Sequence, residues 1–212
     1  NTLARSGVGK LRIVDRDFLE LNNLQRQVLY DEEDVAAGLP KAIAAVKRLQ
    51  RINSEIAYEP IVTDIDCENI DELAADVDVI VDGTDNFETR LLVNDYALSQ
   101  GKPWVYGGCI GAEGQTMTIL PGETACLNCI LPDVPPPGTT PTCDTAGVLG
   151  PIVNIVASYQ AAEAIKLLSG HREAVSRQLT IFEVWENRIR QIDLAELRQH
   201  SDCRACRGEY VW

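Results

Sequence analysis

Four cysteines stand in two pairs whose spacing is suited to binding a metal ion. Cys126 and Cys129 form one CxxC pair, and Cys203 and Cys206 form the other. Zinc binds four soft ligands in a tetrahedron, and two such pairs supply four thiolates. Two redox-active pairs, or four unrelated thiols, are the alternatives. A redox pair usually begins a helix after a strand, which residues 122–125 (GETA) do not resemble, so we expect a structural zinc site.

The two cysteine pairs are far apart in the sequence, with residues 130–202 between them. This separation is much longer than in a local zinc ribbon. A shared metal ion would therefore attach the C-terminal tail to an earlier part of the chain. His200 lies near the second pair, but four thiolates already complete a zinc site, so we do not expect it to be a ligand.

Polar residues gather after the first apolar run, Lys10–Asp15 (KLRIVD). Asp15 ends that run. In dinucleotide-binding folds an acid at the end of such a strand accepts hydrogen bonds from ribose hydroxyls, although a simple turn residue is the alternative. Asn23, Arg26 and Gln27 follow closely. They are either further ligand-binding groups or a solvated helical turn.

Lys41 stands in the first turn of a predicted helix that begins at Pro40. A lysine at this end opposes the helix dipole, which favours acids there. A bound anion would remove the conflict, because the lysine and the first amide groups would hold it together. An ordinary surface lysine is the alternative.

A second polar group, Asp82–Asn86 (DGTDN), follows the apolar run Val77–Val81. Open α/β sheets bind ligands beyond the carboxyl ends of their strands. Asp85 at such a place could hold magnesium together with substrate phosphates. Asp85 or Asn86 could also cap the next helix, and the two interpretations are compatible.

The remaining cysteines differ in their surroundings. Cys143 ends the stretch Pro132–Cys143, which contains five prolines and three threonines, and it precedes a helix expected to begin near Gly147. A helix start lowers the pKa of a thiol and favours the nucleophilic thiolate. Cys143 is therefore either a reactive thiol or an inert one. Cys67 and Cys109 have no partner motif, and we expect them to pack in the core.

The elements that must position these residues alternate between strands and helices. The apolar runs predict buried strands at Lys10–Asp15, Ala57–Val62, Val77–Val81, Trp104–Cys109 and Gln115–Leu120. Helices are predicted at Pro40–Ile52 and Thr89–Ser99. This alternation is typical of a mostly parallel α/β sheet with helices on its faces. Two further strands, Gln178–Val184 and Arg188–Ile192, predict a hairpin around Glu186-Asn187.

Composition limits the classes of function. The chain has 212 residues, of which 45% are hydrophobic and 24% charged, and a formal net charge of −13. The negative charge argues against nucleic-acid binding, which depends on neutralising phosphates, and against docking on an anionic membrane. The stretch Ala146–Leu168 is too polar to span a bilayer. Seven cysteines without a secretory signal predict a reducing compartment, and we expect a cytoplasmic protein.

Taken together, the motifs resemble one family. The runs Ile13–Asp17 and Asn23–Gln27, then Lys41, then Thr84–Asn86, then the two CxxC pairs, are similar to the ThiF/MoeB/HesA family of sulfur-carrier adenylyltransferases, which are related to ubiquitin-activating enzymes. The resemblance covers nearly the whole chain. It implies a doubly wound Rossmann-like domain, ATP and Mg²⁺ as ligands, a structural Zn²⁺, a homodimer, and a ubiquitin-like partner ending in Gly-Gly that serves thiamine or molybdopterin synthesis.

The same resemblance implies a role for each matching residue. Asp15 binds the ribose, Asn23, Arg26 and Lys41 contact the ATP phosphates with Gln27 nearby, and Asp85 organises magnesium. Cys143 matches a cysteine that some members use for covalent or sulfur-transfer chemistry. The catalytic residues implied in this way are Arg26, Lys41, Asp85 and Cys143. The metal ligands are Cys126, Cys129, Cys203 and Cys206.

The chain departs from the family pattern at its start. Family members open with a strand and a glycine-rich phosphate loop, which this sequence lacks, so we expect a segment to precede Asn1. Within residues 1–212 we expect a single adenylation domain, with a nucleotide-binding part at 1–121 and a zinc-binding, crossover-loop and carrier-docking part at 122–212. The alternatives are a catalytically inactive, zinc-containing module that binds a ubiquitin-like partner, a nicotinamide-dependent dehydrogenase, and a related enzyme acting on transfer RNA.

Overall fold

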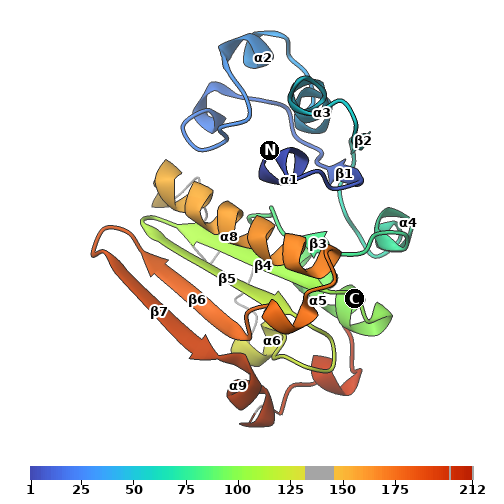
Figure 1. The fold of residues 1–212 in the computed structure, drawn as a ribbon, viewed down its shortest axis with the longest axis vertical. Coiled ribbons are helices and arrows are strands. Elements are labelled where there is room, and N and C mark those ends of the chain that lie inside the picture. Colours follow the sequence, from blue (N-terminus) through green and yellow to red (C-terminus); the bar gives the residue numbers. More distant parts are fainter. Residues whose placement is uncertain (132–145, 201, 212) are drawn as a thin grey trace. The chain divides into compact units, whose positions relative to one another are not determined.

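The structure, a computed structural model, describes residues 1–131, 146–200 and 202–211. It divides the chain into two compact units, Asn1–Ile65 and Asp66–Trp212 (Figure 1). Each unit is described by itself below. The elements of both units make this a mixed α/β protein.

The first unit is built around two parallel strands, β1 (Lys10–Val14) and β2 (Ala57–Ile61). Helix α3 (Lys41–Ile52) connects them and packs its apolar face on them, with Leu49 in a core shared with Leu11 and Ile13. A parallel pair needs a crossover of this kind. These elements confirm the predicted strands and helix. The unit also contains α1 (Thr2–Arg5), the 3₁₀ turn η1 (Leu21–Asn23) and α2 (Glu32–Ala36).

The second unit contains a five-stranded sheet in the order β3-β4-β5-β6-β7. The strands are β3 (Ile80–Val81), β4 (Trp104–Ile110), β5 (Glu113–Ile119), β6 (Gln178–Glu183) and β7 (Arg188–Asp193). Among the described residues of this sheet, the pairing of β3 with β4 is parallel, and the other three pairings are antiparallel. The prediction of a mostly parallel sheet is wrong here, because tight turns join β4 to β5 and β6 to β7, and such turns can join only antiparallel strands.

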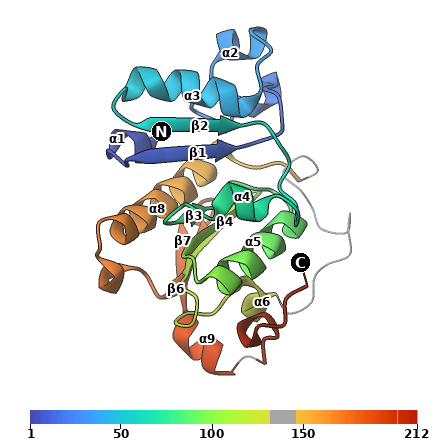
Figure 2. The same cartoon turned by 90° about the vertical axis from the view of Figure 1, so that its right-hand side faces the viewer.

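Helices cover both faces of this sheet (Figure 2). The long helix α8 (Gly150–Leu168) lies along one face, where it packs on β4 and β5. Helix α5 (Phe87–Gln100) lies on the opposite side and ends at Gly101, which adopts the left-handed conformation with φ 67°. The shorter elements of the unit are α4 (Ile70–Ala74), α6 (Leu127–Ile130), η2 (Arg172–Ala174), α9 (Leu194–His200) and η3 (Ala205–Arg207).

Glycines let α8 approach the sheet closely. A Cβ atom at Gly107 would lie 2.5 Å from the side-chain nitrogen of Gln160, and one at Gly114 would lie 2.6 Å from a methyl group of Val156. Both glycines therefore make room for α8. Beside them, Ile152 and Val156 pack against Phe182 of β6. In the part of the chain that the structure describes, no helix is long and apolar enough to cross a membrane.

Some predicted details differ from the structure. The strand expected at Val77–Val81 is limited to Ile80–Val81, and α8 begins at Gly150. Cys109 packs against the core as expected, but Cys67 is exposed. The expectation that Cys67 lies in the core is wrong, because it sits in the turn before α4 and not on an apolar face. The stretch Pro132–Cys143 lies outside the described residues.

Gly114→Ala should destabilise the protein. The added methyl group would meet Val156 and Ile152 of α8 at 2.6–2.9 Å, and overpacking of this kind costs about 1–3 kcal/mol. Denaturant unfolding would measure this fall in the free energy of unfolding. Gly9→Ala is the control, because nothing lies within 4 Å of a Cβ atom at Gly9. Equal stability of the two variants would show that α8 and β5 are not tightly packed.

Candidate functional site

The four paired cysteines form one cluster in the second unit. Their sulfur atoms all lie within 4.8 Å of one another. The sulfur–sulfur distances are 3.8 Å for Cys126–Cys129, 3.6 Å for Cys126–Cys203, and 3.5 Å for both Cys129–Cys206 and Cys126–Cys206. A tetrahedral zinc ion about 2.3 Å from each ligand sets neighbouring sulfurs about 3.8 Å apart. The cluster therefore has the dimensions of a four-thiolate metal site.

Helix α5 holds both cysteine pairs in place. The Asn94 side chain, fully buried, accepts a hydrogen bond from the Leu127 amide at 2.9 Å and donates one to Asn128 at 2.9 Å. The neighbouring Asp95 accepts from the amide of Val211 at 2.9 Å. The first contact fixes the turn between Cys126 and Cys129, and the second fixes the chain after Cys206.

Without a bound cation, the clustered thiols are difficult to deprotonate. Contacts with the Cys129 and Cys206 sulfurs, followed by burial, raise the pKa of Cys126. Contact with Cys126 lowers the pKa of Cys206, but Cys129 and burial outweigh it and raise the pKa to about 12. Thiolates packed this closely repel one another, and a bound metal ion removes that penalty. The donor set therefore fits a metal that prefers sulfur.

In the first unit, Asp15 follows β1 directly, as predicted. Its amide bonds to the carbonyl oxygen of Ile61 at 3.1 Å, which continues the β1–β2 ladder by one residue. Its carboxylate accepts from the amide of Asp17 at 2.8 Å. Asp15 is half-buried, so an acidic group stands at the carboxyl end of the strand, where open α/β sheets bind ligands.

The residues Asn23 to Gln27 form a compact turn after η1. Asn23 is buried, and its side chain accepts from the Glu20 amide at 3.1 Å. Arg26 donates to the carbonyl oxygen of Asn22 at 3.0 Å. The Gln27 side-chain oxygen is buried and has no hydrogen-bond partner in residues 1–131, 146–200 and 202–211. A buried acceptor without a donor is uncommon, and a ligand donor would satisfy it.

Lys41 is buried at the start of α3, with 9% of its surface exposed. Its ammonium group lies 3.0 Å from the carboxylate of Asp17, and its amide donates to the Asp17 carbonyl oxygen at 2.8 Å. The negative group beside Lys41 at this helix start is therefore the Asp17 carboxylate of the protein itself. Because Asp17 is more than half exposed, its carboxylate can turn into water, and the buried ammonium group of Lys41 would then require another anion.

Tyr30 joins these residues, and the sequence reasoning missed it. Its hydroxyl donates to the carbonyl oxygen of Lys41 at 3.0 Å, and its backbone amide donates to the carbonyl oxygen of Gln27. Burial, and then the charges of Asp15 and Asp34, raise the pKa of Tyr30. The phenol therefore stays protonated at neutral pH. Tyr30 thus connects two of the predicted residues of the first unit, Gln27 and Lys41, by hydrogen bonds.

Asp85 belongs to the second unit, in the loop between β3 and α5, and its side chain is exposed. Asn86 caps α5 by accepting from the amide of Thr89 at 2.8 Å. The predicted helix cap is thus confirmed for Asn86, which leaves the carboxylate of Asp85 exposed at the helix start. Cys143 lies outside the described residues.

Comparisons with known proteins agree with these motifs. The ThiF family model matches residues 1–205. The chain belongs to the ThiF family. It is 47% identical over 204 residues to a sulfur carrier protein ThiS adenylyltransferase of Bacillus subtilis, which covers 96% of this chain and 59% of that protein. It is 39% identical to a SAMP-activating enzyme E1 of Haloferax volcanii, over 96% of this chain and 73% of the relative.

A solved structure of Escherichia coli MccB with MccA-N7isoASN has the same fold, with a TM-score of 0.79 and 24% identity over 96% of this chain and 61% of that one. At this identity the likeness supports the fold alone. The chain spans a little under three fifths of the Bacillus relative. The similarity to this relative therefore concerns one part of that protein.

Within this ThiF-family chain, several buried polar residues escaped the sequence reasoning. Arg90 is 7% exposed and pairs with Asp82, which is also 7% exposed. Burial lowers the pKa of Arg90, but the charge of Asp82, the hydrogen bond to Asp82 and the charges of Tyr106 and Asp85 together outweigh it, so the pKa rises. The sequence did contain a signal, because Arg90 is a charged residue in the predicted helix that follows the polar group Asp82–Asn86. Gln160 of α8 is likewise buried against this region.

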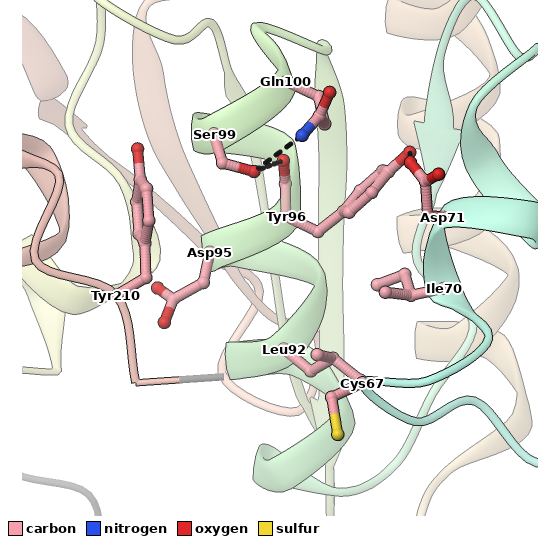
Figure 3. Close-up of a pocket in the computed structure, with 9 residues that line it drawn as sticks. All are labelled: Cys67, Ile70, Asp71, Leu92, Asp95, Tyr96, Ser99, Gln100 and Tyr210. Carbon is pink, nitrogen blue, oxygen red and sulfur yellow. Dashed lines mark hydrogen bonds between the residues drawn. The ribbon is translucent and has the colours of Figure 1, made fainter.

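A cavity of about 240 Å³ lies beside α4, α5 and the chain end (Figure 3). Figure 3 shows Asp95 between α5 and Tyr210, and the hydroxyl of Tyr96 directed at Asp71, to which it donates at 3.2 Å. Burial, and then the charge of Asp95, raise the pKa of Tyr210. Among the described residues that line this cavity there is no predicted site residue.

Proposed function

We propose that this chain is the adenylation part of an enzyme that uses ATP to activate the C-terminal glycine of a ubiquitin-like sulfur carrier. The similarity over 96% of the chain to a ThiS adenylyltransferase, at 47% identity, carries the proposal. The name of the Haloferax relative, a SAMP-activating enzyme E1, supports the same class of reaction. We further propose that the protein acts as a cytoplasmic homodimer on a carrier ending in Gly-Gly, of the thiamine or molybdopterin type.

The polar residues of the first unit suit the nucleotide. Asp15 would accept hydrogen bonds from the ribose hydroxyls. Asn23, Arg26 and Lys41 would contact the phosphates, and Gln27, whose buried oxygen has no partner among the described residues, would lie nearby. Lys41 would exchange the Asp17 carboxylate at 3.0 Å for a phosphate oxygen. That exchange keeps the ammonium group paired throughout.

The proposed reaction is acyl adenylation. The glycine carboxylate of the carrier attacks the α-phosphorus of ATP, an acyl–oxygen–phosphorus bond forms, and pyrophosphate leaves. The protein needs no general base, because a carboxylate is already ionised at neutral pH. The contribution of the chain is therefore to position the two reactants and to stabilise the charge that develops on the phosphate oxygens. Arg26 and Lys41 are the cations that we assign to that task.

Asp85 would supply a carboxylate ligand to magnesium. Its side chain is exposed beside the start of α5, and a hard cation of this kind binds through one or two carboxylates and the substrate phosphates. Magnesium, when bound, neutralises charge on the phosphates. Cys143 remains a candidate for a covalent step in sulfur transfer.

Cys126, Cys129, Cys203 and Cys206 would bind zinc as a structural ion. Four protein thiolates leave no open position on a tetrahedral ion, so a catalytic role for it is unsupported. The separations of 3.5–3.8 Å between the sulfurs support this donor set. The ion would attach the C-terminal segment to the short helix α6, whose N-cap is Cys126 and which contains Cys129.

Cys203→Ser should remove the zinc and release the C-terminal segment. Structural zinc in small peptides binds with about 10–16 kcal/mol, which is comparable with the whole stability of a domain, so losing a ligand should expose residues 202–211 to proteolysis. Elemental analysis and limited proteolysis would measure both effects. Cys67→Ser is the control, because Cys67 is an exposed thiol outside the cluster. Full zinc content in the Cys203→Ser protein would contradict the assignment.

Lys41→Gln should slow adenylation strongly, and Arg26→Gln should do the same. By analogy with the loss of one oxyanion-hole donor, each change should lower the rate about 10²–10³-fold. Carrier-dependent exchange of labelled pyrophosphate into ATP would measure this loss. Lys47→Gln is the matched control, because Lys47 lies on the same helix and is exposed. Unchanged exchange in the Lys41→Gln protein would remove Lys41 from the site.

Asp85→Ala should abolish pyrophosphate exchange at any magnesium concentration, because the variant lacks the proposed carboxylate ligand. Glu88→Ala is the matched control, since it removes an exposed acid from the first turn of the same helix. Normal turnover of the Asp85→Ala protein would refute the proposed magnesium ligand.

The function itself is tested with the full-length protein, ATP, magnesium and several candidate carriers that end in Gly-Gly. Pyrophosphate exchange that depends on one carrier would establish the reaction and identify the pathway. Binding of ATP and zinc without exchange for any carrier would indicate another substrate class. Binding of a carrier without binding of ATP would indicate an inactive docking module.

A further inference from the structure

A buried ion pair lies directly behind the loop that carries Asp85. Arg90 of α5 and Asp82 at the end of β3 are each 7% exposed, and Nε of Arg90 lies 3.1 Å from Oδ2 of Asp82. A buried charge without a partner is strongly destabilising, so the two residues hold each other in place. The aromatic rings of Phe87 and Tyr106 lie 5.8 and 5.3 Å from the guanidinium carbon.

The guanidinium group also binds the loop itself. Nη2 of Arg90 donates to the carbonyl oxygen of Thr84 at 2.5 Å and to that of Gly107 on β4 at 2.9 Å. The Thr84 carbonyl belongs to the peptide group that ends at the nitrogen of Asp85. Because a peptide group is planar, fixing this oxygen fixes the backbone from which the Asp85 side chain projects.

Asp82 fixes the same loop from its other side. Its Oδ1 accepts from the amide of Thr84 at 2.8 Å and from the hydroxyl of Thr84 at 2.7 Å. Asp85 therefore lies between Thr84, which is held at its amide, hydroxyl and carbonyl, and Asn86, which caps α5.

Helix α8 supports this arrangement from the opposite face of the sheet. The side-chain nitrogen of Gln160 donates to the carbonyl oxygen of Asp82 at 2.8 Å and to that of Val105 at 3.1 Å. Gly107 leaves the space that Gln160 occupies. The end of β3 and the neighbouring first half of β4 are thus held by buried polar side chains from both sides.

We propose that Arg90 is a positioning residue for Asp85, acting through the Thr84 peptide and the Asp82 carboxylate. The inference rests on the proposed role of Asp85 as a magnesium ligand. Arg90 is buried, and besides its electrostatic attraction to Asp85 it acts through these hydrogen-bonded neighbours. Lysine cannot replace it, because an ammonium group cannot reproduce the planar fork that reaches Asp82, Thr84 and Gly107 together.

The test compares Arg90→Lys with Arg172→Lys in the full-length protein. Arg172 is the matched control, because it also binds one carboxylate oxygen, that of Glu123, through Nε and Nη2 at 2.9 and 2.7 Å, but on the surface and away from the loop. Hydrogen exchange of the amides of residues 83–86 is measured first, without substrate. We expect exchange about tenfold faster in Arg90→Lys, because the charged hydrogen bond to the Thr84 carbonyl oxygen is lost, and no change in Arg172→Lys.

The second measurement is pyrophosphate exchange as a function of magnesium concentration. If Asp85 is displaced, half-maximal activity of Arg90→Lys should require about tenfold more magnesium, while zinc content and the apparent KM for the carrier stay as in the parent protein. A merely structural defect would lower the active fraction without changing the magnesium requirement. Loop exchange and a magnesium requirement equal to those of the Arg172→Lys protein would overturn the proposal.

A third variant covers the possibility that Arg90→Lys does not fold. Thr84→Ala keeps the ion pair and removes only the hydroxyl bond to Asp82, so it should show a smaller change in the same direction. Equal loop exchange in Thr84→Ala and the parent protein would then overturn the proposal. If the parent protein catalyses no exchange with any carrier, the proposed function fails, and the amide exchange alone decides whether Arg90 holds the loop.

Discussion

The ion pair between Arg90 and Asp82 is the constraint on which the second unit depends. It joins the end of β3, the loop that follows, helix α5 and the middle of β4 through one guanidinium group. Buried charges are stable only when each has its partners, so these four segments are held in one arrangement. Gln160 adds α8 to the same set through the carbonyl oxygens of Asp82 and Val105. The backbone geometry of a polar loop is thus set by the core beneath it.

The first unit uses charge differently, at a partly exposed place. Lys41 is buried, but its partner Asp17 is more than half exposed. A carboxylate on the surface is held weakly, since exposed ion pairs contribute about 0–1 kcal/mol. A multiply charged anion that reached Lys41 would compete well against it. The first unit therefore keeps Lys41 buried, and the pairing with Asp17 reduces the free-energy cost of burying its charge.

Much of this could be predicted from the sequence. Periodicity located β1, β2, α3, α5 and the hairpin of β6 and β7, and the spacing of the cysteines predicted their meeting, because CxxC pairs have few other uses. The direction of the strands could not be predicted, since β4 is as apolar as a parallel strand and the two-residue turn at Gly111 is the feature that marks β4 and β5 as antiparallel. Buried polar contacts such as Asn94–Leu127 and Gln160–Asp82 also escaped, because each joins residues distant in sequence. The assignments of Asp15, Asn23, Arg26, Gln27, Lys41, Asp85 and Cys143 to roles remain predictions.

Helix α5 has 14 residues, with Asn86 as its cap, and carries Asn94 in its middle. An α-helix rises about 1.5 Å per residue, so the loop before it and the turn between Cys126 and Cys129 are separated by a rigid rod. Insertion of a single residue between Asn86 and Asn94 would turn one end by about 100° relative to the other. The length of this segment is consequently as restricted as the identity of its residues, and relatives that keep both ends should neither gain nor lose a residue between them.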